Sequence, residues 1–324
     1  MTGVPSPGPA APDVLTLGET MAAFRAAGAL RLGGSLQLSI AGAESTVAIG
    51  LARLGHRVRW LGVTGADEPG ELIRRTLRAE GVDLTGARID PDAPTGLILF
   101  EPRVGDLTRV SYYRTGSAGS RLDASDVAAA FAPPGAAPRI LHVTGITCAL
   151  GPEPRAAVAA AIERTRAAGG TVCLDVNHRR RLWSTERAAA VLRPLLPSVD
   201  VLVASDDELA VLTDDTTDPA RGVLAAGVGE VVVKHGADGA TSHTPAGSVH
   251  RPARRVAAVD TIGAGDAFVA GLLSGRLDGL DVAGRLDRAA TTAAFAVATR
   301  GDWEGLPTRA ELPLLDHAPG TALR

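Results

Sequence analysis

Apolar runs and amphipathic stretches alternate through most of the chain. Runs with the length of buried strands lie at 13–18, 140–143, 171–176, 201–203 and 230–233. Stretches with the apolar spacing of helices lie at 44–54, 153–168, 186–195 and 206–212, and another begins at 263. Strands that alternate with helices in this way pair in parallel, with the helices as crossovers. The pattern therefore predicts an α/β fold with a parallel sheet and flanking helices.

Two segments interrupt this alternation, at about 19–42 and 95–118. Each contains short runs of β-branched and aromatic residues punctuated by glycine, which is typical of antiparallel strands. We predict that together they form a small antiparallel β-sheet, which lies over the main domain as a lid. Residues 13–315 then form the domain that carries this lid, and residues 1–12, rich in Pro, Ala and Gly, form a flexible tail.

Composition argues against several classes of protein. The chain has 324 residues, 45% hydrophobic and 3% aromatic, with a net charge of −3. Few aromatic rings and a negative net charge argue against nucleic-acid binding, which favours stacking rings and basic surfaces. No apolar run approaches the roughly 20 residues that cross a bilayer. Cys148 and Cys173 lie in apolar surroundings without metal-ligand spacing, so we expect buried thiols and a cytoplasmic protein.

The candidate chemistry follows the predicted strands, where open α/β sheets bind their ligands. Gly263, Ala264 and Gly265 open a predicted helix, and their amides can point together at an anion. Asp266 follows in the first turn, where the helix dipole is expected to keep it ionised and able to accept a hydroxyl proton during phosphoryl transfer. Taken alone, Gly-x-Gly-Asp equally describes a tightly packed helix start with an ordinary first-turn acid.

The longer run at 260–268, Asp-Thr-Ile-Gly-Ala-Gly-Asp-Ala-Phe, resembles the second signature of the ribokinase (PfkB) family of carbohydrate kinases. The resemblance implies that Asp266 is the base that deprotonates a sugar hydroxyl, and that the amides of Gly263, Ala264 and Gly265 form an anion hole. It also implies a Rossmann-like, ribokinase-like fold with a β-lid, and ATP and Mg²⁺ as cofactors. A homo-oligomer, either a dimer through the lid or a larger assembly, is expected, and a requirement for a monovalent cation is left open.

The first signature of the family is matched less closely. The run at 41–48 reads Ala-Gly-Ala-Glu-Ser-Thr-Val-Ala, with Thr46 at a position where members commonly have Asn. By resemblance, the sugar-binding residues of this run are Gly42, Ala43, Glu44, Ser45 and Thr46.

The nucleotide loop of the family resembles the run that starts at Lys234, the only lysine of the chain. Residues assigned to the nucleotide by resemblance are Asn177, Ser205, Lys234, Gly236, Gly239 and Thr261. Glu208 stands where the family has a glutamate that organises water around Mg²⁺. Its position also fits the first turn of a helix capped by Ser205, and both roles are compatible.

Three further pieces, at 112–118, 175–183 and 300–305, resemble the 2-keto-3-deoxygluconate kinases of this family. Tyr112 and Arg114 are two residues apart on a predicted strand and therefore share a face, toward the cleft. A guanidinium binds a carboxylate in bidentate fashion, which a neutral sugar cannot match. By resemblance, Arg179 lies near the sugar acid or the ATP phosphates, and Asp302 binds a substrate hydroxyl, although an aspartate that caps its loop fits the sequence equally well. The resemblance implies ATP-dependent phosphorylation of 2-keto-3-deoxygluconate, or a close epimer, to its 6-phosphate.

Several alternatives remain at this point. Another sugar kinase of the family is the nearest, such as a fructokinase, a ribokinase or a 5-dehydro-2-deoxygluconate kinase. A Schiff-base aldolase would need a lysine nucleophile, and the only lysine lies in the phosphate loop. A non-catalytic sugar-binding protein on the same fold is disfavoured by the intact Asp266 run. Ala290 stands where relatives often have Asn, so the adenine contacts stay undecided. The sequence also leaves open the preferred epimer of the substrate and the size of the oligomer.

Overall fold

The structure is a computed structural model that describes residues 11–104, 107–133 and 135–317. Within this part of the chain, eight strands form the main sheet, in the order β14-β13-β12-β11-β10-β9-β1-β4. The strands are β1 (Val14–Leu17), β4 (Val58–Leu61), β9 (Ile140–Thr144), β10 (Thr171–Asp175), β11 (Val201–Ser205), β12 (Glu230–Lys234), β13 (Ala240–Thr244) and β14 (Gly247–Arg251). From β4 to β12 all pairings are parallel, which confirms the predicted α/β fold. The glycine-punctuated stretch after β12 is an antiparallel hairpin that extends this sheet.

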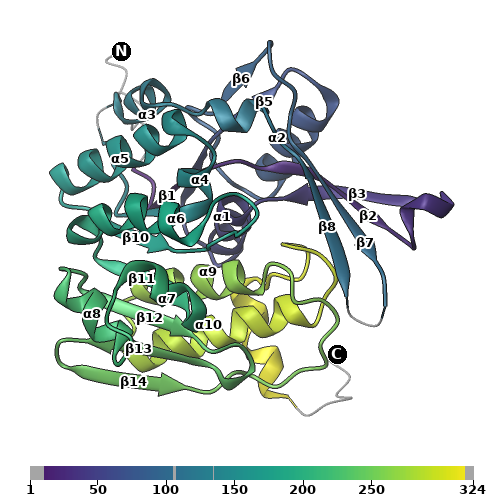
Figure 1. Cartoon of the computed structure of the whole chain (residues 1–324). Coiled ribbons are helices and arrows are strands. Elements are labelled where there is room, and N and C mark those ends of the chain that lie inside the picture. The colour runs from purple at the N-terminus through teal and green to yellow at the C-terminus, as the bar shows by residue number, and fades with distance from the viewer. Residues whose placement is uncertain (1–10, 105–106, 134, 318–324) are drawn as a thin grey trace, which may run out of the picture.

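Helices cover both faces of the sheet because successive strand residues point to opposite sides (Figure 1). One apolar core packs against α1 (Ala43–Arg53), α2 (Glu68–Ala79), α9 (Ala264–Leu277) and α10 (Val282–Val297). The other packs against α3 (Ala124–Phe131), α4 (Gly145–Ala149), α5 (Pro152–Ala167), α6 (Thr185–Leu192), α7 (Asp206–Leu212) and α8 (Pro219–Ala225). Short 3-10 helices lie at Leu30–Leu32, Ala118–Arg121, Arg193–Ser198, Gly236–Asp238 and Arg309–Asp316.

One predicted helix is shorter than expected. The stretch 186–195 was predicted as a single helix, but α6 ends at Leu192 and continues as the 3-10 helix Arg193–Ser198. Pro194 and Pro197 account for this, because proline has no backbone N–H to donate in an α-helix.

The lid is a sheet of four strands within the described residues, in the order β3-β2-β7-β8. Its strands β2 (Met21–Ala26), β3 (Leu36–Ala41), β7 (Leu97–Pro102) and β8 (Thr108–Tyr113) all fall in the two predicted segments. The expectation of a fully antiparallel sheet is wrong for one pairing, since β2 and β7 are parallel. Each segment forms its own antiparallel hairpin, and the two first strands, which leave the body in the same direction, join the hairpins (Figure 1).

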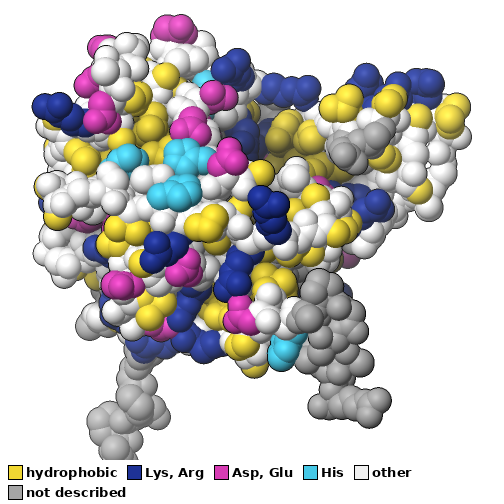
Figure 2. All heavy atoms as spheres, turned by 90° about the horizontal axis from the view of Figure 1, so that it is seen from below, with side chains coloured by type: hydrophobic (Ala, Val, Ile, Leu, Met, Phe, Trp, Pro, Cys, Tyr) yellow, Lys and Arg dark blue, Asp and Glu magenta, His cyan; other side chains and the backbone are white. Residues whose placement is uncertain are grey.

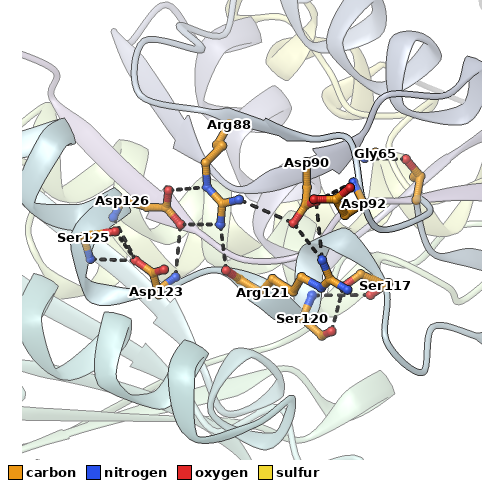
Figure 3. A network of polar contacts seen from close by, with 11 residues as sticks. Gly65, Arg88, Asp90, Asp92, Ser117, Ser120, Arg121, Asp123, Ser125 and Asp126 are labelled. Atoms are coloured by element: carbon orange, nitrogen blue, oxygen red, sulfur yellow. Dashed lines mark hydrogen bonds and ion pairs between the residues drawn. The ribbon is translucent and has the colours of Figure 1, made fainter.

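A polar network fixes the chain that leaves the lid to the body of the protein (Figure 3). Arg88, in the short strand β6 (Arg88–Asp90), donates to Asp126 at 2.7 Å and to the Arg121 carbonyl at 2.8 Å. Arg121 in turn pairs with Asp90 at 3.3 Å. β6 pairs in parallel with β5 (Val63–Gly65) beside the main sheet. The lid is therefore anchored where it joins the body, while its strands extend beside the carboxyl ends of the parallel strands.

Two further expectations concern burial and membranes. Cys148 and Cys173 are free thiols in the core, and burial raises the pKa of Cys148 to about 12, so both are buried as predicted. Among the described residues, no helix has the length and apolar character needed to span a bilayer. Of the predicted flexible tail, residues 1–10 lie outside the described part of the chain.

Candidate active site

A cleft of 560 Å³ lies between the lid and the carboxyl ends of the parallel strands. Lid residues such as Met21, Ile98 and Phe100 form one wall, and Figure 2 shows the lid projecting beside the body with a hollow between them. A second, largely apolar cavity of 640 Å³ lies beside it. Residues that line both cavities are Lys234, Thr261 and Gly265. The two cavities therefore meet at the N-terminus of α9.

The predicted base, Asp266, lies at this junction in the first turn of α9. Gly263 caps the helix with a φ of 76°, and a Cβ at this position would lie 2.2 Å from the Asp302 carbonyl oxygen, so only glycine fits. The first amides of a helix have no intrahelical partner, so that of Gly265 is available to an anion, whereas that of Ala264 donates to the Thr261 carbonyl at a long 3.4 Å. These amides lie next to the Asp266 carboxylate, and their role as an anion hole stays a prediction.

The charge state of Asp266 differs from the expectation that the helix dipole keeps it ionised. Burial raises its pKa to about 7, and the neighbouring Asp175 contributes in the same direction, whereas Arg179 and Lys234 lower it. Desolvation therefore outweighs the helix dipole, although Asp266 lies in the first turn, where the dipole acts. A carboxyl group with this pKa is matched to proton transfer near neutral pH.

Asn177, predicted as a nucleotide ligand, contacts Asp266. Its Nδ2 donates to Asp266 Oδ1 at 3.3 Å. Among the described non-glycine residues, Asn177 alone has a positive φ, at 40°. Asparagine tolerates this conformation better than most residues, and such strain is typically retained where it orients a functional group. A contact of Asn177 with nucleotide stays a prediction.

Lys234 pairs with a residue that the sequence interpretation had not singled out. Its Nζ lies 3.1 Å from Oδ1 of Asp175, a fully buried carboxylate at the end of β10. Burial lowers the pKa of Lys234, but Asp175, Glu208 and Asp266 outweigh this and raise it, so the lysine is charged. An acid at the end of an otherwise apolar strand was the available signal for Asp175.

Ser205 and Glu208 lie at the start of α7 and both line the cleft. Glu208 accepts from the backbone N–H of Ser205 at 2.8 Å and from that of His178 at 2.7 Å, so its helix-capping role is present. The described residues contain no cluster of three or more His, Cys, Asp or Glu that could hold a metal. Mg²⁺ on a nucleotide takes most ligands from phosphate and water, so one carboxylate at the cleft wall fits a water-mediated role.

The run 42–46 divides into two parts. Gly42, Ala43 and Glu44 line the cleft. Ser45 and Thr46, expected to bind the sugar, do not line the cleft, because both are buried in the first turn of α1 and the Ser45 hydroxyl donates back to the Gly42 carbonyl at 3.0 Å. In place of Asn, Thr46 is therefore part of the helix packing.

Glu44 is a buried carboxylate at the end of the cleft. It accepts from the hydroxyl groups of Thr144 and Thr147, both at 2.6 Å, and burial raises its pKa. These two hydrogen bonds hold the Glu44 side chain in place at the wall of the cleft.

Tyr112 and Arg114 both line the cleft, as predicted. Arg114 follows directly after β8, its guanidinium lies 5.7 Å from the Tyr112 ring centroid, and its Nε donates to Glu19 at 2.7 Å. The Glu19 side chain is fully buried. The charge of Arg114 is thus already balanced by an acid that the sequence interpretation missed, from 95 residues earlier in the chain.

Arg179 is the contrasting cation. It is exposed and lines the cleft, and in the described part of the chain its side chain makes no ion pair or hydrogen bond. Asp302 also lines the cleft; burial raises its pKa to about 7 although Arg25 lowers it. The expected nucleotide residues Gly236 and Gly239 line the apolar cavity, together with Ala290.

Together these features define a phosphotransferase of the α/β class. A helix N-terminus and a lysine provide positive charge where two cavities meet, and a buried carboxylate with a pKa of about 7 lies beside them. The apolar cavity has the size of a nucleotide pocket, and the polar cleft that of a small hydroxylated substrate.

Known proteins lead to the same class. Residues 11–309 match the pfkB family of carbohydrate kinases. The 2-dehydro-3-deoxygluconokinase of Bacillus subtilis (strain 168) is 36% identical over 93% of this chain and 94% of its own length. The 2-dehydro-3-deoxygalactonokinase of Haloferax volcanii is 33% identical over 90% of this chain and 92% of its own length. The crystal structure of a Ribokinase II from E. coli with ATP and Mg²⁺ has a TM-score of 0.86 at 25% identity, covering 94% of this chain and 99% of that one.

The chain therefore belongs to the pfkB family of carbohydrate kinases and is a phosphotransferase.

Proposed function

We propose that this kinase transfers the γ-phosphoryl group of ATP to the terminal hydroxyl of a sugar acid, 2-keto-3-deoxygluconate or its galactonate epimer. The observation that carries the phosphoryl transfer is the position of Asp266, at the α9 N-terminus where both cavities meet. Two relatives that are named for these sugar acids and match nine-tenths of the chain support the choice of substrate.

In this proposal the adenine and ribose of ATP occupy the apolar cavity, whose walls include Phe268 and Ala290. The phosphates lie at the junction, where Lys234 and the first amides of α9 offset charge that develops on the transferring group. Asp266 accepts the proton of the sugar hydroxyl as the oxygen attacks phosphorus. Mg²⁺, which a related structure contains together with ATP, would neutralise phosphate charge, with Glu208 holding its water shell.

The sugar acid lies in the cleft under the lid. Arg179 supplies an unbalanced positive charge for the carboxylate, and Arg114 offers its remaining N–H groups while Glu19 holds it in place. Asp302 accepts from a sugar hydroxyl.

A kinase of a neutral sugar such as fructose is the second candidate. The observation that favours it is the ion pair between Arg114 and Glu19, which leaves the cleft with less free positive charge than Arg114 alone would provide. The preference for an acid then depends mainly on Arg179.

A coupled assay of ADP release over a substrate panel tests the proposal. The panel contains 2-keto-3-deoxygluconate, its galactonate epimer, 5-dehydro-2-deoxygluconate, fructose and ribose. We expect the highest kcat/KM for one of the two keto-deoxy acids. A higher kcat/KM for fructose or ribose would refute the sugar-acid assignment and leave the kinase activity standing.

Association through the lid is part of the same proposal. Large hydrophobic side chains are exposed on the lid, including Leu36 at 46%, Leu38 at 52% and Tyr113 at 62%, and hydrophobic atoms are visible on this part of the surface (Figure 2). Such residues on one projecting sheet are typical of a protein interface. Light scattering after size exclusion should give a mass above that of one 33.0 kDa chain. We also expect the protein to be cytoplasmic.

A further inference from the structure

Arg25 connects the lid to two carboxylates of the body. It lies in β2, and its Nη1 is 3.1 Å from Asp260 Oδ2, while its Nη2 donates to Asp302 Oδ1. Its side chain is only 10% exposed. The guanidinium carbon lies 4.1 Å from the ring centroid of Phe100, its neighbour across the β2–β7 pairing and a residue of the cleft wall. A planar guanidinium suits this arrangement, since it can stack on a ring and bind two carboxylates at once.

Both carboxylates belong to the segments that shape the anion hole. Asp260 accepts from the N–H of Ile262 at 3.1 Å and from that of Gly301 at 3.3 Å, so it joins the chain before α9 to the loop that carries Asp302. The backbone of Asp302 in turn packs against Gly263, the residue that caps α9. A displacement of Arg25 would therefore reach both the start of α9 and the Asp302 side chain.

A second contact joins the lid to the same loop. The Ser39 hydroxyl, in β3, donates to Glu304 at 2.6 Å, and the other carboxylate oxygen of Glu304 accepts from the Trp303 N–H at 3.1 Å. Within the described residues, the lid thus holds the loop after Gly301 at two points, and of these Arg25 alone also contacts a carboxylate that lines the cleft.

We infer that Arg25 is a positioning residue for phosphoryl transfer: it couples the lid to the anion hole and holds the Asp302 carboxylate ready for the sugar. The inference goes beyond the proposed function, because it rests on the kinase site and not on which sugar is bound. It needs no direct contact between Arg25 and the substrate.

The charge balance around Asp302 gives the inference a measurable signature. Groups that act on its carboxylate are Arg25, Asp266, Glu304 and Asp260, of which only Arg25 is a cation. Asp266 raises the pKa of the Asp302 carboxylate, and burial raises the pKa values of both groups to about 7. Loss of Arg25 disfavours the ionised form of the Asp302 carboxylate, which moves the acid limb of kcat/KM to higher pH.

The test compares Arg25→Met, which keeps length and contact with Phe100, with Arg109→Met as a control on the same lid sheet. The Arg109 side chain is 60% exposed and 3.8 Å from its partner Glu101. With the best sugar of the panel, Arg25→Met should lower kcat/KM by about 10- to 100-fold, the range for loss of a charge-assisted contact. Its acid limb should also move to higher pH, while Arg109→Met leaves both unchanged.

Two further variants separate positioning from folding. Arg25→Lys should recover part of the rate and of the acid limb, because an ammonium retains the charge but cannot bind both carboxylates as a planar fork; it also remains informative if Arg25→Met does not fold. In an Asp302→Asn background, Arg25→Met should no longer move the acid limb. A folded Arg25→Met with the wild-type profile, or the same shift in the Asp302→Asn background, would overturn the inference.

Discussion

The two sides of the cleft obtain their charges in different ways. On the floor, Asp266 and Lys234 lie at the ends of neighbouring elements, and burial sets the pKa of the carboxyl group. On the lid side, Arg114 pairs with Glu19, 95 residues away in the sequence, and Arg25 pairs with Asp302, 277 residues away. The proposed chemistry therefore lies on the floor, whereas the ion pairs of Arg114 and Arg25 decide how much positive charge the lid side leaves for the proposed substrate.

We expect the largest effect on activity from a substitution on the floor of the cleft. Asp266→Asn should lower kcat by about 10²- to 10⁴-fold, the span of a positioned general base, because no other described carboxylate lies at the start of α9. Affinity for ATP should change little, since the amides and Lys234 are retained. Single-turnover rates and nucleotide titration of the same preparation measure the two separately, and near-wild-type turnover would refute the role of Asp266.

Thermal unfolding provides the control for this variant. The pKa of Asp266 is about 7 in the folded protein, above its ordinary value of 3.8, so its contribution to stability is fully present below about pH 4 and is lost as the pH rises through 7. At neutral pH the buried carboxylate thus disfavours folding, and Asp266→Asn should unfold at the same or a higher temperature than the wild type. A loss of activity with a lower Tm would point to damaged folding instead.

The next effect contrasts a free arginine with a paired one. Arg179→Ala should lower kcat/KM for the keto-deoxy acid by about 10- to 100-fold, since a charge-assisted contact contributes roughly 1.5–3 kcal/mol. A neutral analogue of equal length should lose little. Arg114→Ala should slow both substrates, because it leaves the carboxylate of Glu19 buried without its cation.

Arg187→Ala, an exposed arginine on α6 outside the cleft, is the matched control and should leave both substrates unaffected. If Arg114→Ala is selective for the acid and Arg179→Ala is not, the roles of the two arginines are reversed. Equal losses for acid and neutral substrates with both variants would refute recognition of the carboxylate by either residue.

The difference between local and distant partners also explains which parts of the structure can be predicted from the sequence. Alternating strands and helices predicted the sheet, and the local run ending at Asp266 predicted a carboxylate beside a glycine-rich helix start, because a helix start brings adjacent residues together without any distant partner. Glu19 and Arg25 had no such local signal. Their roles depend on partners that only the folded lid brings close. Ser45 and Thr46 show the converse, since their place in a signature did not reveal that both would face the packing of α1.

The smallest effect concerns the helix start at Glu208, where two roles compete. Glu208→Gln removes the charge from a carboxylate that caps α7, which should lower the free energy of unfolding by about 0.3–1 kcal/mol whatever else the residue does.

Glu311→Gln is the matched control, because Glu311 caps its own helix in the same way, with the Thr308 N–H at 2.7 Å, and does not line the cleft. Both variants should therefore lose similar stability, but only Glu208→Gln should need more Mg²⁺ for half-maximal rate, since a neutral amide holds the water shell of a cation more weakly. Magnesium titration of initial rates, with ATP held constant, measures this difference. If the two variants titrate alike, Glu208 acts only as a helix cap, and the floor of the cleft leaves Mg²⁺ to the nucleotide and water.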